Sequence, residues 1–84
     1  MRVLSYNLCA LPGLSGDIPE RLRRVCRALP PLKPDVLLFQ EVFLSRHLEL
    51  LGSLLGDWPH RFSGRRSALG FSGGLAVFSR FPIL

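Results

Sequence analysis

The sequence predicts an α/β protein in which strands and helices are layered around one hydrophobic core. Two short apolar segments of strand type flank an amphipathic helical segment, and this order is typical of a parallel sheet with a crossover helix. A second helical segment and two further strand-like segments follow. The predicted organisation is βαβ, then α, then ββ, within the single domain that 84 residues can form.

The first strand is expected over residues 3–8, followed by a loop rich in Gly and Pro over residues 11–16. Asp17 is expected to cap the next helix, because Glu20 follows three residues later as in a capping box. Pro30-Pro31 ends this helix. Apolar residues at helical spacing predict its buried face, which consists of Ile18, Leu22, Val25, Cys26 and Leu29.

The second strand contains the apolar run Val36–Phe39, which predicts a strand covered on both faces. The run continues directly into Gln40 and Glu41, so this buried strand is expected to end in a carboxylate. Asn7 is expected to end the first strand with an amide side chain. Parallel pairing would bring Asn7 and Glu41 to the same edge of the sheet, where open α/β proteins usually bind ligands. The alternative is that both side chains only satisfy backbone groups in the following turns.

The second half of the chain is expected to contain a helix and an antiparallel pair of strands. Ser45 is the expected N-cap of this helix and Gly56 its end. The strands are expected from residues 61–63 and over residues 75–79, with a turn at residues 64–66 between them. The predicted buried face of the helix consists of Leu44, Leu48, Leu51 and Leu55.

Other polar and small residues receive structural interpretations. His47 and His60 are expected to be partly exposed structural residues, and Cys9 and Cys26 to be small buried hydrophobic residues, because no spacing typical of zinc sites or disulfide scaffolds is present. Gly73-Gly74 does not fit a phosphate-binding loop, and we expect it to permit close packing at the start of the last strand.

Asn7 and Glu41 are the candidate catalytic residues. One carboxylate beside an amide suits Mg²⁺, which binds one or two protein carboxylates and completes its octahedron with water and phosphate oxygens. Glu41 would therefore be the ligand of Mg²⁺ or another divalent cation. Asn7 could donate a hydrogen bond to the phosphoryl group that the metal polarises.

The net charge of +5 comes almost wholly from arginine, because Lys33 is the only lysine among eleven basic residues. Arginine binds phosphate oxygens through two parallel donors, so the charge favours partners such as nucleic acid or lipid head groups. The arginines of the first helix are better explained as a solvated helix face, formed by Arg21, Arg23, Arg24 and Arg27. The sequence contains neither a signal peptide nor a run of about 18 apolar residues, which predicts a soluble chain and leaves its compartment open.

Three segments, RVLSYNL, PDVLLFQEV and GGLAVFSRFPI, resemble the opening part of the endonuclease/exonuclease/phosphatase family of metal-dependent phosphodiesterases. The segment NLCALPGLSGDIPERLRRV is similar to the neutral sphingomyelinase branch, in which a Leu- and Pro-containing loop precedes an arginine-rich helix. The resemblance implies that this chain is the N-terminal βαβ-α-ββ portion of the family's four-layer α/β sandwich. It also implies that Glu41 is the magnesium ligand and that Asn7 helps to hold the scissile phosphate.

By the same resemblance, residues 1–84 form the N-terminal part of a single phosphodiesterase-type domain, truncated before the family's catalytic His, Asp-x-Asn and Asp-His motifs. The complete domain would hydrolyse a phosphodiester, as a sphingomyelinase converts sphingomyelin to ceramide and phosphocholine. The present chain alone is expected to be inactive, because it lacks a general base.

The resemblance implies a phosphodiester substrate that is a lipid head group rather than nucleic acid, with peripheral contact to a membrane surface. Two alternatives stay open. The complete protein could be an endonuclease or phosphatase of the same family, or the chain could be a truncated, non-catalytic module that binds a phosphate ligand or a partner through its sheet edge.

Overall fold

The computed structural model describes residues 1–10, 16–63 and 71–83. Most of the predicted loop at residues 11–16 and the predicted turn at residues 64–66 lie outside the described residues. The elements follow the predicted βαβ-α-ββ order. They are strand β1 (Val3–Ala10), helix α1 (Ile18–Ala28), a short 3₁₀ helix (Pro30–Leu32), strand β2 (Val36–Leu44), helix α2 (Ser45–Leu54), strand β3 (His60–Ser63) and strand β4 (Phe71–Ser79).

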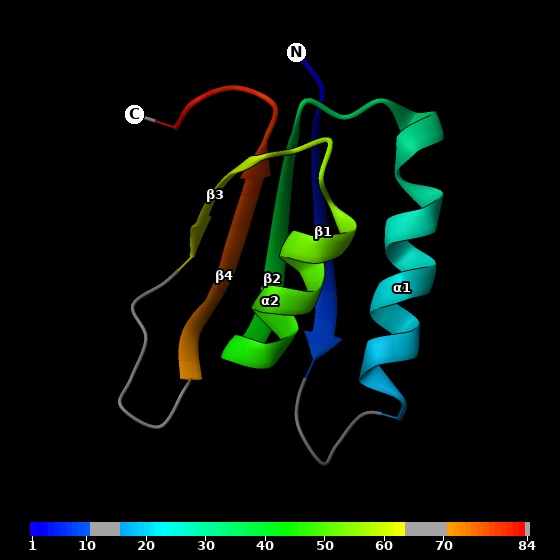
Figure 1. Cartoon of the computed structure of the whole chain (residues 1–84), viewed down its shortest axis with the longest axis vertical. Coiled ribbons are helices and arrows are strands. Elements are labelled where there is room, and N and C mark those ends of the chain that lie inside the picture. The colour runs from blue at the N-terminus through cyan, green and yellow to red at the C-terminus, as the bar shows by residue number, and fades with distance from the viewer. Residues whose placement is uncertain (11–15, 64–70, 84) are drawn as a thin grey trace.

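The strands form a four-stranded mixed sheet in the order β1-β2-β4-β3. β1 pairs with β2 in parallel, whereas β4 pairs antiparallel with both β2 and β3. The predicted parallel pair and the predicted antiparallel pair are therefore confirmed. Both helices lie on the same face of this sheet, and α1 connects the two parallel strands (Figure 1).

Helix α1 begins as the sequence predicts. The Asp17 carboxylate accepts a hydrogen bond from the Glu20 backbone N–H at 3.2 Å, which satisfies one of the free donors of the first turn. The Glu20 carboxylate pairs in turn with Arg27 at 3.5 Å and with Arg23 at 4.0 Å on the solvent side. The predicted face is turned to the core, where burial raises the pKa of the Cys26 thiol to about 11.

Helix α2 begins one residue earlier than predicted, because the sequence predicts Ser45 as the N-cap. Ser45 is the first helical residue, and Leu44 occupies the N-cap position without a side-chain cap hydrogen bond. The reason is that β2 stays extended up to Leu44, so no linker residue separates the strand from the helix. Leu48, Leu51 and Leu55 are buried as expected, and the helix ends at Leu54, two residues before Gly56.

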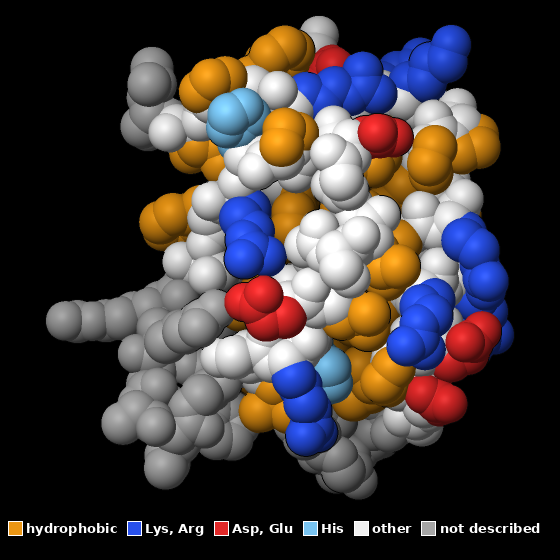
Figure 2. All heavy atoms as spheres, in the orientation of Figure 1, with side chains coloured by type: hydrophobic (Ala, Val, Ile, Leu, Met, Phe, Trp, Pro, Cys, Tyr) orange, Lys and Arg blue, Asp and Glu red, His pale blue; other side chains and the backbone are white. Residues whose placement is uncertain are grey.

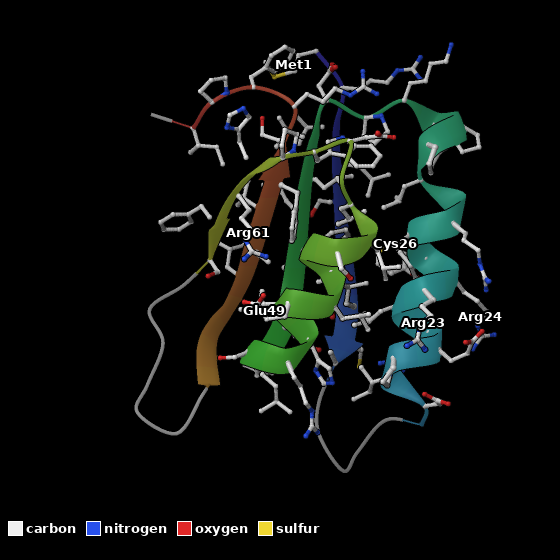
Figure 3. All side chains as sticks on the ribbon, in the orientation of Figure 1. Met1, Arg23, Arg24, Cys26, Glu49 and Arg61 are labelled. Carbon is white, nitrogen blue, oxygen red and sulfur yellow. The ribbon has the colours of Figure 1, made fainter. Side chains whose placement is uncertain are left out.

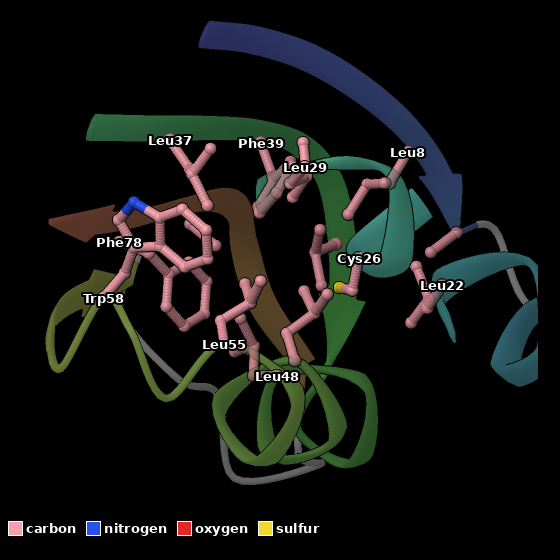
Figure 4. Packing of buried hydrophobic residues seen from close by; sticks show 14 of the residues in the cluster. Leu8, Leu22, Cys26, Leu29, Leu37, Phe39, Leu48, Leu55, Trp58 and Phe78 are labelled. Atoms are coloured by element: carbon pink, nitrogen blue, oxygen red, sulfur yellow. The ribbon is translucent and has the colours of Figure 1, made fainter. Parts of the chain in front are cut away.

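The hydrophobic core fills the space between the sheet and the two helices (Figure 4). The rings of Phe39 in β2 and Phe78 in β4 meet edge to face with centroids 6.0 Å apart. Trp58, in the segment between α2 and β3, is buried, and its Nε1–H donates to the Pro34 carbonyl at 2.8 Å. This hydrogen bond joins the segment after α2 to the segment that precedes β2.

Within the described residues, β2 is covered on one face only, so the prediction of a strand covered on both faces is wrong. Leu37 and Phe39 are buried beneath the helices, whereas Val36 and Leu38 on the other face are only half-buried. The apolar run predicted full coverage because β2 is an inner strand, but both helices occupy the same side. No helix in the described part of the chain is long and apolar enough to cross a membrane.

Gly74 in β4 has a positive φ of 90°, and it lies opposite Val42 of β2. A Cβ atom at this position would lie 2.7 Å from Cε1 of Phe43. The expectation that glycine here permits close packing at the start of the last strand is therefore confirmed for Gly74.

Gly74→Ala should destabilise the chain, because the new methyl group meets the Phe43 ring and alanine disfavours a positive φ. We expect a loss of at least about 1 kcal/mol, seen as a fall in Tm of about 4 °C or more in a thermal unfolding experiment. Gly56→Ala is the matched control, because nothing lies within 4 Å of its added Cβ. Equal Tm values for the two variants would contradict this account of Gly74.

Candidate functional site

The candidate site lies where the carboxyl ends of β1 and β2 meet. Asn7 of β1 is paired with Gln40 of β2, and Glu41 follows Gln40 directly. The sequence predicts that Asn7 and Glu41 end their strands, and the structure corrects this point, because β1 continues to Ala10 and β2 to Leu44. The parallel pairing nevertheless places the two positions on neighbouring strands at the same level.

The strands continue past this level, and bulges interrupt their pairing there. Between the Asn7–Gln40 and Ala10–Val42 pairs, two residues of β1 lie opposite Glu41 alone. Cys9 and Glu41 both have a positive φ, of 52° and 61°, which is unusual for residues other than glycine. Such conformations cost about 1–3 kcal/mol each and concentrate at functional sites, where a bulge changes the direction of a side chain.

The carboxamide of Asn7 is oriented by the backbone that follows it. Its Oδ1 accepts a hydrogen bond from the Cys9 N–H at 2.8 Å. The Nδ2 donors of Asn7 have no acceptor among the residues that the structure describes, and the side chain is exposed. Asn7 is therefore held with its donor group available to a ligand.

The neighbouring backbone is fixed by Arg21 of α1, whose Nη2 donates to the Cys9 carbonyl at 2.7 Å. A hydrogen bond from a charged donor contributes about 1.5–3 kcal/mol, which is comparable with the cost of a left-handed residue. The sequence assigns Arg21 only to a solvated helix face, and its spacing carries no signal of this contact. Cys9 itself is exposed, so its expected burial is wrong, whereas Cys26 is buried as predicted.

Glu41 is half-buried, and no basic side chain in the described part of the chain pairs with its carboxylate. No cluster of three or more His, Cys, Asp or Glu side chains with metal-binding geometry occurs among the described residues. A single carboxylate excludes a structural zinc site built from these residues. It fits a Mg²⁺ ion that takes most of its ligands from water and substrate.

His47 lies in the first turn of α2 and is only 3% exposed, so the expectation of a partly exposed residue is wrong. Its Nδ1 has no hydrogen-bond partner among the described residues. Burial lowers the pKa of this imidazole below its ordinary value of 6.5, and the charges of Arg46 and Arg21 lower it further. His47 is thus a neutral core residue at neutral pH.

This lowered pKa predicts that the chain loses stability in mild acid. Below pH 6.5 the unfolded chain binds a proton at His47 that the folded chain does not, so the free energy of unfolding falls as the pH falls toward the lowered pKa. His47→Leu should reduce this fall, measured by urea unfolding at about pH 7.5 and about pH 5.5.

Arg46→Gln should also reduce the pH dependence, because it removes a charge that repels the protonated imidazole. Arg24→Gln is the control, since Arg24 is exposed and does not contribute to the shift. Equal pH dependence in the parent, the His47 variant and the Arg46 variant would contradict this role of His47.

A separate open cavity of about 490 Å³ lies between α2 and β3. Arg61 and Glu49 face one another beside it, with Nη2 and Oε1 3.6 Å apart (Figure 3). The guanidinium of Arg61 lies directly over Gly52, where a Cβ atom would meet it. Asn7 and Glu41 do not line this cavity, so it is distinct from the candidate site.

The Endonuclease/Exonuclease/phosphatase family matches residues 4–84 of the chain. This chain belongs to that family. Its α/β fold is the fold expected from the resemblance of the three sequence segments. Members of the family generally use a divalent metal ion.

Two curated relatives align with the whole of this chain. A putative neutral sphingomyelinase of Drosophila melanogaster is 31% identical, and an inositol phosphosphingolipids phospholipase C of Schizosaccharomyces pombe is 33% identical. The chain covers 19% and 20% of their respective lengths, or about a fifth of each. The predicted relation to the neutral sphingomyelinase branch is confirmed.

Solved structures of the endonuclease/exonuclease/phosphatase fold also match. A β-hairpin deletion mutant of beta toxin from Staphylococcus aureus aligns with 98% of this chain at a TM-score of 0.77 and 22% identity. An endonuclease/exonuclease/phosphatase from Beutenbergia cavernae aligns with all of it at a TM-score of 0.74 and 23% identity. The chain covers 36% and 27% of these structures, respectively, and the likeness confirms the predicted fold.

Proposed function

We propose that residues 1–84 form the N-terminal part of one phosphodiesterase-type domain, which hydrolyses the phosphodiester of a sphingolipid head group. The names of the two curated relatives support this substrate class. The observation that supports the proposal is the parallel pairing of β1 and β2, in which Asn7 lies opposite Gln40, the residue directly before Glu41. We use the term complete domain for this chain together with the further residues that we expect by comparison with its longer relatives.

Glu41 would hold a Mg²⁺ ion or another divalent cation through its carboxylate. When bound, the cation would supply Lewis-acid polarisation of a phosphoryl oxygen. Asn7 would donate from Nδ2 to the same phosphoryl group, because its Oδ1 is already engaged by the Cys9 N–H. A donor that is oriented before the substrate binds stabilises developing negative charge without further rearrangement.

The general base is expected to come from the rest of the complete domain. His47 is almost fully buried in the first turn of α2, and burial disfavours the protonated imidazole that a general base must form. His60 belongs to β3, which is separated from β1 by two strands. We therefore expect this chain alone to have no measurable turnover.

Contact with a lipid surface would use the distributed basic side chains. The net charge is +5, and Figure 2 shows Lys and Arg side chains at several places on the visible face, alternating with acidic ones. This distribution supports a weak peripheral attraction to anionic lipid head groups rather than a continuous groove for nucleic acid.

Glu41→Gln in the complete domain should lower hydrolysis of sphingomyelin in mixed vesicles by at least about 100-fold, because the amide cannot replace a charged metal ligand. Activity that remains should respond less steeply to added Mg²⁺, and the circular dichroism spectrum should be unchanged. Unchanged turnover would remove Glu41 from the mechanism.

Glu49→Gln is the matched control, because Glu49 is an exposed carboxylate of α2 that is paired with Arg61 beside the separate cavity. The unsubstituted complete domain should also be assayed on plain DNA, on DNA with abasic sites and on a phosphomonoester. Hydrolysis of one of these substrates in preference to sphingomyelin would support an endonuclease or phosphatase instead. Tight phosphate binding without turnover would support a non-catalytic module.

A further inference from the structure

Two hydrogen bonds connect helix α1 to the candidate catalytic amide. Arg21 Nη2 donates to the Cys9 carbonyl at 2.7 Å, and the Cys9 N–H donates to Asn7 Oδ1 at 2.8 Å. Cys9 thus accepts on one side and donates on the other, while its φ of 52° holds it in the left-handed region. The orientation of Asn7 depends on this one residue keeping an unfavourable backbone conformation.

Arg21 differs from the other arginines of α1 in what it contacts. Arg23 and Arg27 pair with Glu20 on the same helix, and Arg24 is exposed and points away from the sheet (Figure 3). Arg21 reaches a strand residue twelve positions away in the sequence. Its Nε is buried without a hydrogen-bond partner among the described residues, whereas the residue as a whole is half-buried.

We propose that Arg21 is a positioning residue, which holds the Cys9 backbone and thereby aims the donor group of Asn7 at the substrate phosphate. The proposal rests on the function proposed above for Asn7. Without the guanidinium, Cys9 would relax toward ordinary strand geometry, and the N–H that orients the carboxamide would turn away. The amide would then rotate freely, and its donor would spend little time in the direction that the reaction requires.

The amide of Asn7 divides two tasks between its two ends. Oδ1 receives the internal hydrogen bond, so Nδ2 remains the end that faces outward. A carboxylate at the same position would keep the internal hydrogen bond and lose the donor. Asn7→Asp therefore separates the donor role from the local structure, because it should preserve the fold and lower kcat.

The decisive experiment compares Arg21→Met with Arg24→Met in the complete domain, using sphingomyelin in mixed vesicles. Arg21→Met should lower kcat by about tenfold to about a hundredfold with KM changed by less than about twofold, because orientation is lost and substrate binding is not. Arg21→Lys should recover part of kcat, since ammonium also donates to a carbonyl. Arg24→Met should behave as the parent protein.

A double variant distinguishes positioning from other roles. In an Asn7→Ala background, Arg21→Met should cause no further loss beyond about twofold, because there is no amide left to orient. Additive losses would overturn the proposal. A raised KM with unchanged kcat in Arg21→Met would also overturn it, since that result indicates direct binding of the substrate phosphate by the guanidinium.

A structural measurement tests the proposal even if the complete domain has no phosphodiesterase activity. Hydrogen exchange of the Cys9 amide should be slow in the parent and in Arg24→Met, and at least about tenfold faster in both Arg21→Met and Asn7→Ala. Arg21→Gln provides the same comparison if the methionine variant does not fold, because its shorter side chain carries no charged donor to the Cys9 carbonyl. Unchanged exchange in these two Arg21 variants would contradict the proposed role, whereas lack of turnover with the expected exchange would contradict only the proposed function.

Discussion

The parallel pairing of β1 with β2 is the constraint on which the candidate site depends. The register places Asn7 beside Gln40. In the same strand β2, the side chains of Leu37 and Phe39 are buried between the sheet and the helices (Figure 4). A slip of one residue would turn the buried face of β2 toward solvent, so the core strongly specifies the register. The packing that stabilises the sheet therefore also determines which polar residues are neighbours.

The bulges give the site a geometry that two regular strands would lack. In regular strands successive side chains point to opposite faces, so Gln40 and Glu41 would be directed apart. The extra residue in the ladder and the left-handed conformation of Glu41 break this alternation locally. Cys9 does the same on β1, and its two hydrogen bonds link that strand to Asn7 and to helix α1.

The sequence predicts those features that depend on local chemistry. The Asp17 cap, the buried face of α1 and the parallel strands follow from residue types and spacing, and each is confirmed. The positions of Asn7 and Glu41 within continuing strands could not be predicted, because left-handed residues other than glycine carry no compositional signal. The burial of His47 depends on how the helices pack on the sheet, and the contact between Arg21 and Cys9 depends on a turn of backbone outside the helix.

A chain shaped only for folding free energy would have glycine at positions 9 and 41, since glycine adopts a positive φ without a steric penalty. Cys9 and Glu41 occupy these positions instead, and their positive φ costs conformational free energy that glycine would not lose. Selection for variants with a higher Tm would therefore favour glycine at these two positions. At Glu41 this substitution would remove the proposed metal ligand, so a more stable variant would be a less active one.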